Sequence, residues 1–92
     1  MPSPDDIRHL VLEVLAAELA MLRLDPADVG DAVDLRAAGL VDSLGFVEVL
    51  TAVEERFGLE IDLEALPPEQ LTVLGPLCRS IALQAGAMEL RT

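Results

Sequence analysis

Apolar residues recur at intervals of three and four over two stretches of the chain, and both stretches predict amphipathic helices. In residues 3–22 the recurring positions are Ile7, Leu10, Val11, Val14, Leu15 and Leu19. Ser3 and Pro4 suit the N-cap and the first helical position, so we expect this helix to begin there. In residues 44–57 the core-facing positions are Phe46, Val49, Leu50, Val53 and Phe57. Gly58 follows where a left-handed residue commonly ends a helix.

Between these two helices the periodicity fails. Residues 24–41 are rich in Asp and Gly, and Val29, Leu35 and Leu40 stand in them as isolated apolar positions. A loop of this length is uncommon in a small domain and is often functional. We expect its apolar residues to anchor it to the core. Residues 59–63 alternate like a strand, but without a second strand to pair with they predict an extended connector.

The last third of the chain predicts a short third helix and a longer final one. Pro68 suits the first turn of a helix of one or two turns over residues 67–71. The final helix is expected to begin between residues 72 and 76, to bury Leu77 and Ile81, and to end near Gly86. The pattern predicts an all-α fold in a single domain over residues 1–87, with residues 88–92 as a frayed tail.

Composition narrows the class of protein. The chain has 92 residues, and 52% of them are hydrophobic, so it can bury enough apolar surface to fold despite its acidity. Seventeen acidic and six basic residues give a net charge of −11, which opposes binding to nucleic acids and to anionic membranes. Cys78 has no partner for an internal disulfide, and the N-terminus is acidic where a secretory signal is basic. We expect a cytoplasmic monomer.

Two further kinds of site are not expected. Four aspartates of the long loop are spaced by three, whereas a calcium loop of the EF-hand type needs ligands at alternate positions: Asp25, Asp28, Asp31 and Asp34. His9 is the only histidine and has no neighbouring ligand cluster. It is also the only histidine available to activate a serine nucleophile. The sequence therefore predicts neither a metal site nor a catalytic residue.

The triplet Asp42-Ser43-Leu44 stands where the long loop meets the second helix. Taken alone, Ser43 is best interpreted as the N-cap of that helix. A hydroxyl at this junction is also exposed, and a phosphate attached to it would meet the positive end of the helix dipole. Ser43 is therefore either a cap or a point of attachment.

In this context the sequence resembles the acyl carrier protein family, including the carrier domains of polyketide and nonribosomal peptide synthases. The resemblance covers nearly the whole chain and includes the letters DSL at residues 42–44, VEERFG at 53–58 and LTV at 71–73. It implies a four-helix, acyl-carrier-protein-like bundle with a long loop between the first two helices and a short third helix.

The resemblance also implies a cofactor and a function. A phosphopantetheinyl transferase would attach 4′-phosphopantetheine from coenzyme A to Ser43, aided by recognition of Asp42. The arm would hold acyl or aminoacyl intermediates as thioesters. Catalysis would reside in partners with a basic docking surface, such as an acyltransferase, a ketosynthase or an adenylating enzyme.

We expect a discrete carrier of bacterial, polyketide-type natural-product biosynthesis, ahead of one serving fatty acid synthesis. Two alternatives stay open. One is a stand-alone aminoacyl carrier, D-alanyl-like or peptidyl, loaded by an adenylating enzyme. The other is an acidic docking module that is never modified.

The second helix has a face that points away from its core stripe, formed by Leu44, Glu48, Thr51 and Glu55. Residues 42–69 hold eight acidic residues against the single Arg56, so most of the net charge lies beside Ser43. An exposed leucine among carboxylates suits basic partners. We expect the residues that partners recognise to be Asp42, Leu44, Glu48, Thr51, Glu54, Glu55 and Ile61.

Two residues beside the triplet have open alternatives. Phe46 is expected to pack in the core, and the alternative is that its ring plugs the entrance to an acyl pocket. Gly45 lies in the first turn of a helix, where glycine costs up to about 1 kcal/mol relative to alanine. It either leaves room for the arm or a partner, or has no such role.

Overall fold

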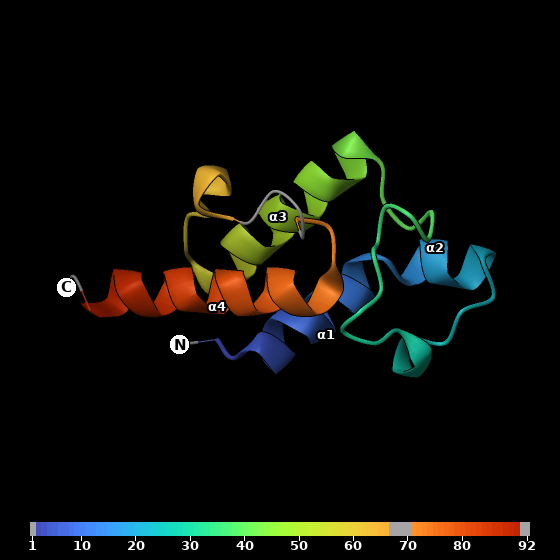
Figure 1. Ribbon diagram of the computed structural model, residues 1–92, viewed down its shortest axis with the longest axis horizontal. Helices are drawn as coiled ribbons and strands as arrows, with labels where there is room; N and C mark the ends of the chain where they lie inside the picture. Colours follow the sequence, from blue (N-terminus) through green and yellow to red (C-terminus); the bar gives the residue numbers. More distant parts are fainter. Residues whose placement is uncertain (1, 67–70, 91–92) are drawn as a thin grey trace.

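The computed structural model describes residues 2–66 and 71–90, with side chains through residue 86. The described residues form four α-helices and two short 3₁₀ turns (Figure 1): α1 (Pro4–Val14), α2 (Ala16–Met21), η1 (Pro26–Asp28), α3 (Ser43–Phe57), η2 (Leu63–Ala65) and α4 (Leu74–Leu90). α1 packs against both α3 and α4. Within residues 2–66 and 71–90 there is no β-strand, only an isolated antiparallel bridge between Asp34 and Val73. The predicted all-α class is confirmed.

The first predicted helix begins as expected but is not continuous. Ser3 caps α1 by accepting a hydrogen bond from the Asp6 amide at 3.1 Å, and the Asp6 carboxylate accepts one from the Ser3 amide at 2.9 Å. Hydrogen bonding of the Asp6 carboxylate to Ser3, first to its backbone amide and then to its side chain, holds the pKa of Asp6 below its ordinary value. A single helix over residues 3–22 was wrong, because Leu15 leaves helical geometry, with φ −90° and ψ 11°. Leu15 and Leu19 are both buried, so the apolar stripe continues across the break.

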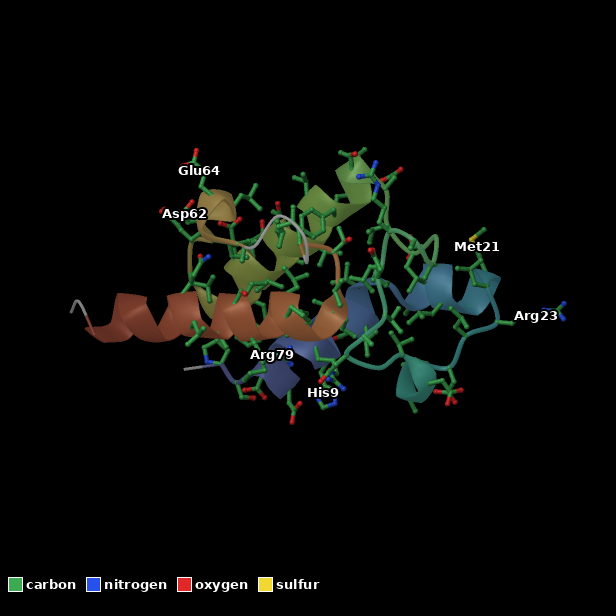
Figure 2. The ribbon with its side chains drawn as sticks, in the orientation of Figure 1. His9, Met21, Arg23, Asp62, Glu64 and Arg79 are labelled. Atoms are coloured by element: carbon green, nitrogen blue, oxygen red, sulfur yellow. The ribbon has the colours of Figure 1, made fainter. Side chains whose placement is uncertain are left out.

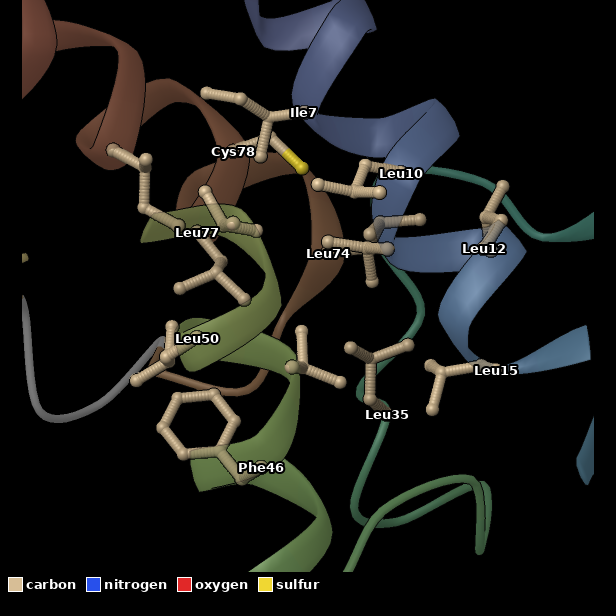
Figure 3. Close-up of a cluster of buried hydrophobic side chains, with 14 of the residues drawn as sticks. Ile7, Leu10, Leu12, Leu15, Leu35, Phe46, Leu50, Leu74, Leu77 and Cys78 are labelled. Atoms are coloured by element: carbon tan, nitrogen blue, oxygen red, sulfur yellow. The ribbon is translucent and has the colours of Figure 1, made fainter. Parts of the chain in front are cut away.

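One hydrophobic core joins the three long helices to the loop (Figure 3). The residues that are fully or almost fully buried are Ile7, Val11, Leu19, Leu35, Val49, Val53, Leu74, Leu77, Cys78 and Ile81. Burying one such aliphatic side chain contributes roughly 1.5–3 kcal/mol. The three predicted loop anchors are buried, and Phe46 is only 8% exposed, so its packing in the core is confirmed. Desolvation in this core raises the pKa of Cys78 to about 11.

Backbone hydrogen bonds fasten the long loop to the segment that enters α4. The Leu35 amide donates to the Thr72 carbonyl at 2.8 Å, and the Leu74 amide donates to the Val33 carbonyl at 2.9 Å. The Thr72 hydroxyl donates to Asp34 Oδ1 at 2.6 Å and, more than any other contact, holds the pKa of that carboxyl below its ordinary value. The loop is thereby held by its core anchors along its length and, near its middle, by hydrogen bonds to the segment that enters α4.

Asp31 lies where the loop meets both α1 and α4. Its carboxylate pairs with the Arg8 guanidinium from α1 and, at 3.7 Å, with Arg79 from α4. Its carbonyl accepts a hydrogen bond from the Gly75 amide at 2.9 Å. A Cβ atom at Gly75 would lie 2.5 Å from the Asp31 Cβ, so glycine is what allows this close approach.

The second predicted helix is confirmed in extent to within one residue, and Gly58 ends it in the left-handed region with φ 63°. In the connector, residues 59–62 carry no helix, but the extended prediction was wrong at Leu63, where η2 begins. Asp62 caps this turn by accepting a hydrogen bond from the Glu64 amide at 3.0 Å. Figure 2 shows both side chains beside the turn.

Two further predictions concern the C-terminal third: the short third helix and the end of the last helix. The short helix predicted over residues 67–71 lies almost wholly outside the described residues. α4 continues to Leu90, so its predicted end near Gly86 was wrong. The domain boundary at residue 87 stays a prediction. No helix among the described residues is long and apolar enough to cross a membrane.

Candidate functional site

The start of α3 is capped by Asp42, not by Ser43. Asp42 has an extended backbone, and its Oδ1 accepts a hydrogen bond from the Gly45 amide at 2.7 Å. The interpretation of Ser43 as the N-cap was therefore wrong. Two residues that both cap helices well stand side by side here, and sequence alone could not choose between them. The choice matters, because a capping hydroxyl would be engaged with the backbone.

Ser43 is the first residue of α3 and is exposed. Within the part of the chain that the structure describes, its hydroxyl makes no hydrogen bond. The first-turn amides of a helix have no intrahelical acceptors, and they favour negative charge placed near them. The site thus combines a free hydroxyl with a favourable position for a phosphate.

The predicted outer face of α3 lies in solvent. Leu44 is 68% exposed. Farther along the same side of the helix, Glu48, Thr51 and Glu55 are exposed as well. The Thr51 hydroxyl donates to the Val47 carbonyl at 2.9 Å, so it is engaged within the helix. Val47, which sequence reasoning did not single out, is 51% exposed. Its position one turn after Leu44 was the signal that could have identified it.

Two of the residues expected to bind partners hold the connector in place. Glu54 Oε2 accepts a hydrogen bond from the Ile61 amide at 2.9 Å, and the Ile61 side chain packs against the core. Glu54 is half-buried, unlike Glu48 and Glu55. The structure therefore gives Glu54 and Ile61 a structural task, and their part in partner recognition stays a prediction.

A groove of about 520 Å³ opens beside Ser43, between the α1–α2 junction, the end of the long loop and the first turns of α3. Residues on both sides of the serine, Asp42 and Leu44, line it, together with Val14, Glu18, Val41 and Glu48. Sequence reasoning missed this groove. Gly45, whose missing side chain leaves part of it open, was its only sequence signal.

The described residues offer no alternative centre of metal chemistry. Among residues 2–66 and 71–86, no three or more histidine, cysteine or acidic side chains gather closely enough to hold a metal ion. His9 lies on α1, away from the start of α3, and its side chain is exposed (Figure 2). The start of α3 is therefore the site on which the comparison with known families bears.

The family model described as the phosphopantetheine attachment site matches residues 6–81. The chain belongs to this family. The match extends from α1 into α4 and includes the start of α3. No curated protein and no solved structure shows significant similarity to the chain.

Membership makes this protein a carrier with a covalently attached 4′-phosphopantetheine group, and it confirms the resemblance to acyl carrier proteins. Its partners include a phosphopantetheinyl transferase and biosynthetic enzymes. The start of α3 fits the group, because it offers a free hydroxyl for the ester and helix amides for the phosphate.

Proposed function

We propose that Ser43 carries the phosphopantetheine arm and that this protein presents acyl or aminoacyl groups to biosynthetic enzymes, which perform the catalysis. The observation that supports this most strongly is the division of tasks at the start of α3. Asp42 satisfies the Gly45 amide, so the neighbouring serine keeps a free hydroxyl in solvent. A transferase can therefore reach the hydroxyl without breaking the helix cap.

The other serines suit attachment less well. Ser3 lies outside the matched residues, and its hydroxyl caps α1. Ser80 is half-buried within α4, where modification would disturb packing. Ser43 alone among the three serines of the chain combines exposure, a free hydroxyl and a helix N-terminus.

The protein's own contribution is the ester oxygen, the helix end beside the phosphate, and a surface that enzymes recognise. When bound, the cofactor supplies a thiol on which an acyl group is held as a thioester. The shared core of α1, α3 and α4 holds α3 in place. Asp42 stabilises the start of α3 through its 2.7 Å bond.

Attachment at Ser43 is tested by intact-mass measurement after incubation with coenzyme A and a broad-specificity transferase. The wild-type chain should gain one phosphopantetheine adduct, Ser43→Ala should gain none, and Ser80→Ala should gain it at the wild-type rate. An adduct that persists in Ser43→Ala, with circular dichroism showing both variants folded, would place attachment elsewhere.

The docking face of α3, which we define as Leu44, Val47, Glu48, Thr51 and Glu55, is proposed to bind basic surfaces of partner enzymes. Its carboxylates are exposed, and eight of the acidic residues of the chain lie between residues 42 and 69. Complementary charge raises association rates at low ionic strength and loses its effect as salt is added.

The transferase is a convenient partner with which to test this face. Glu48→Arg should lower its kcat/KM several-fold at low salt, and the deficit should shrink as ionic strength rises. Glu13→Arg makes the same change of charge on an exposed position of α1 and should have a smaller effect. Equal losses in both variants would mean that net charge alone, and not the face, governs docking.

For the biological setting we propose a discrete carrier of polyketide-type biosynthesis. Loading assays separate it from the aminoacyl carrier: malonyl-type donors with an acyltransferase on one side, amino acids and ATP with an adenylating enzyme on the other. Loading by the second route alone would replace this setting with an aminoacyl pathway.

A further inference from the structure

The groove beside Ser43 has a definite relation to the attachment point. Asp42 and Leu44 border the serine on either side along the chain, and both line the groove. Figure 1 shows the start of α3 and the loop that precedes it toward the same end of the bundle as α2. A group attached to Ser43 therefore leaves the protein at the rim of this groove.

The groove is large enough for a small molecule and is kept open by specific residues. Its volume of about 520 Å³ falls within the roughly 300–1,000 Å³ that is usual for ligand sites. Gly45 contributes no side chain to it, and no atom outside its immediate neighbours lies within 4 Å of the position of a Cβ at Gly39. Phe46, the bulkiest residue of the first turn of α3, points into the core instead. The space is thus open at Gly39, whereas at Gly45 a Cβ would lie 3.1 Å from Asp42 Oδ1 and 3.8 Å from the Val41 Cβ, both of which belong to the wall of the groove.

The lining matches the chemistry of the arm. Apolar surface for the geminal methyl groups of the phosphopantetheine arm and for the alkyl parts of its cargo is offered by Val14, Val41 and Leu44. Glu18, Asp42 and Glu48 offer carboxylate oxygens to the amide N–H and hydroxyl groups. The arm has two amide N–H groups, a hydroxyl and an apolar segment, and this groove provides acceptors and apolar walls for them together.

The charge of the lining sets a further condition on the cargo. None of the described side chains that line the groove is basic, and three of them are carboxylates. A carboxylate brought into it is repelled, whereas a neutral acyl chain is not, and an ammonium group is attracted.

We propose that the groove on the α2 side of α3 seats the arm carried by Ser43, together with the first part of a neutral or cationic acyl group, and leaves a carboxylate-ended acyl group in solvent. This inference rests on the proposed attachment at Ser43. It assigns Val14 of α1 and Glu18 of α2, both outside the docking face, to the handling of cargo.

The test compares backbone amide chemical shifts of the full chain before and after modification by coenzyme A and the transferase. The expected result is a set of shift changes that reaches Glu18, Gly39 and Val41, in addition to the immediate neighbours of Ser43. Changes confined to residues 42–45, or found at Val47 and Leu63 instead, would overturn the inference.

Two variants with matched controls sharpen the measurement. Val14→Trp fills the groove from its rim and should at least halve the shift changes at Gly39 and Val41. Ala17→Trp places the same ring on an exposed position of α2 that does not line the groove and should leave those changes intact. Equal effects of the two variants would show that the arm does not enter the groove.

Coenzyme A analogues with amide-linked acetyl, alanyl or malonyl groups test the condition on charge. The acetyl and alanyl forms should keep the shift changes at Glu18, and the malonyl form should lose at least half of them. Glu18→Gln should restore part of that loss, whereas Glu13→Gln should not. A malonyl form that behaves like the acetyl form would overturn the charge condition.

Failure of this inference can be told apart from failure of the proposed function. The mass spectrum of each sample reports whether Ser43 is modified. An adduct without shift changes in the groove overturns the seating of the arm and leaves the attachment intact. Absence of an adduct overturns the attachment itself.

Discussion

At the scale of single residues, Asp42 and Ser43 separate two tasks that one side chain could not perform at once. The oxygen of a serine that caps a helix accepts a hydrogen bond from a backbone amide and is then held against the helix end. Here the carboxylate of Asp42 does the capping. The adjacent hydroxyl is free, although it stands on the first turn of α3.

This separation predicts how Asp42 variants behave. Asp42→Ala should destabilise the fold by about 0.5–2 kcal/mol, because the Gly45 amide loses its acceptor. Asp42→Asn retains an acceptor oxygen, and its loss of stability should be only a few tenths of the loss in Asp42→Ala. Urea unfolding followed by circular dichroism measures both.

A transferase assay under conditions where both variants are folded then separates capping from recognition. If Asp42→Asn is modified at the wild-type rate while Asp42→Ala is slowed, the cap governs modification. If both are slowed equally, the transferase reads the carboxylate charge.

At the scale of elements, the packing of the long loop against α4 depends on the absence of a side chain at one position. The Asp31 carbonyl accepts a hydrogen bond from the Gly75 amide, and the Asp31 side chain occupies the space that a Cβ at Gly75 would take. The same aspartate reaches Arg8 and Arg79, so the contact joins three parts of the chain.

Gly75→Ala should therefore destabilise the protein by about 1–3 kcal/mol through overpacking. The clash is with the Cα and Cβ of Asp31, which move only with the loop backbone. Gly30→Ala is the matched control: a Cβ there meets nothing within 4 Å and the residue lacks a positive φ. Its unfolding free energy should equal or exceed that of the wild type. Equal losses in the two variants would contradict the packing explanation.

The hydrogen bond between Thr72 and Asp34 makes this loop contact sensitive to pH. Folding lowers the pKa of Asp34 below its ordinary value of 3.8, so the folded state favours the carboxylate. The resulting stability is fully present above pH 3.8 and is lost as pH falls through the folded-state pKa. Thr72→Val should reduce stability near neutral pH, and its difference from the wild type should narrow in acid.

The control for this pH dependence is Thr51→Val. The Thr51 hydroxyl donates to a backbone carbonyl, which does not titrate. Its effect on the urea midpoint should stay constant from pH 7 into the acid range. A Thr72→Val effect that is equally constant would show that the charge on Asp34 does not matter.

The elements that the sequence predicted well are those with local signals. α3 has a strict apolar period and a glycine at its end, and its bounds were predicted to within one residue. The break at Leu15 escaped notice because no glycine or proline marks it and the apolar stripe runs through it. η2 also has a local signal, because Asp62 stands two residues before Glu64 and accepts a hydrogen bond from its amide. The prediction of an extended connector did not include that signal.

Other features could not be predicted from one sequence. The pairing of the long loop with residues 72–75 uses backbone groups that every residue has, so the side chains do not encode its register. The groove beside Ser43 is formed by two segments distant in the chain, residues 14–18 and 39–49. Ser43 itself was identified by its neighbours in the sequence, but its freedom from capping needed the backbone angles of Asp42.

At the scale of the whole molecule, the net charge of −11 on 92 residues sets a self-repulsion that the fold must overcome. The carboxylates of η2, Asp62 and Glu64, project from one side in Figure 2. Added salt shortens the distance over which exposed charges interact: the Debye length falls from about 10 Å at 0.1 M to about 3 Å at 1 M. Screening relieves repulsion more than it weakens the few ion pairs among the described residues.

The midpoint of urea unfolding should therefore rise between about 0.05 and 0.5 M NaCl. Urea is uncharged and does not itself screen. Glu64→Gln removes one exposed charge and should reduce the salt dependence without changing the fold. A midpoint that falls with salt would mean that the Asp31 ion pairs outweigh the repulsion.

The burial of Cys78 matters because the phosphopantetheine arm of this protein carries a second thiol. Thioesters exchange with thiolates, so a reactive cysteine on a carrier competes for its cargo. Cys78 is 2% exposed and its pKa is about 11, so in the folded protein it is both inaccessible and protonated near neutral pH. Within the molecule, the acyl group thus has a single thiol to occupy, and transfer to Cys78 does not compete with transfer to a partner enzyme.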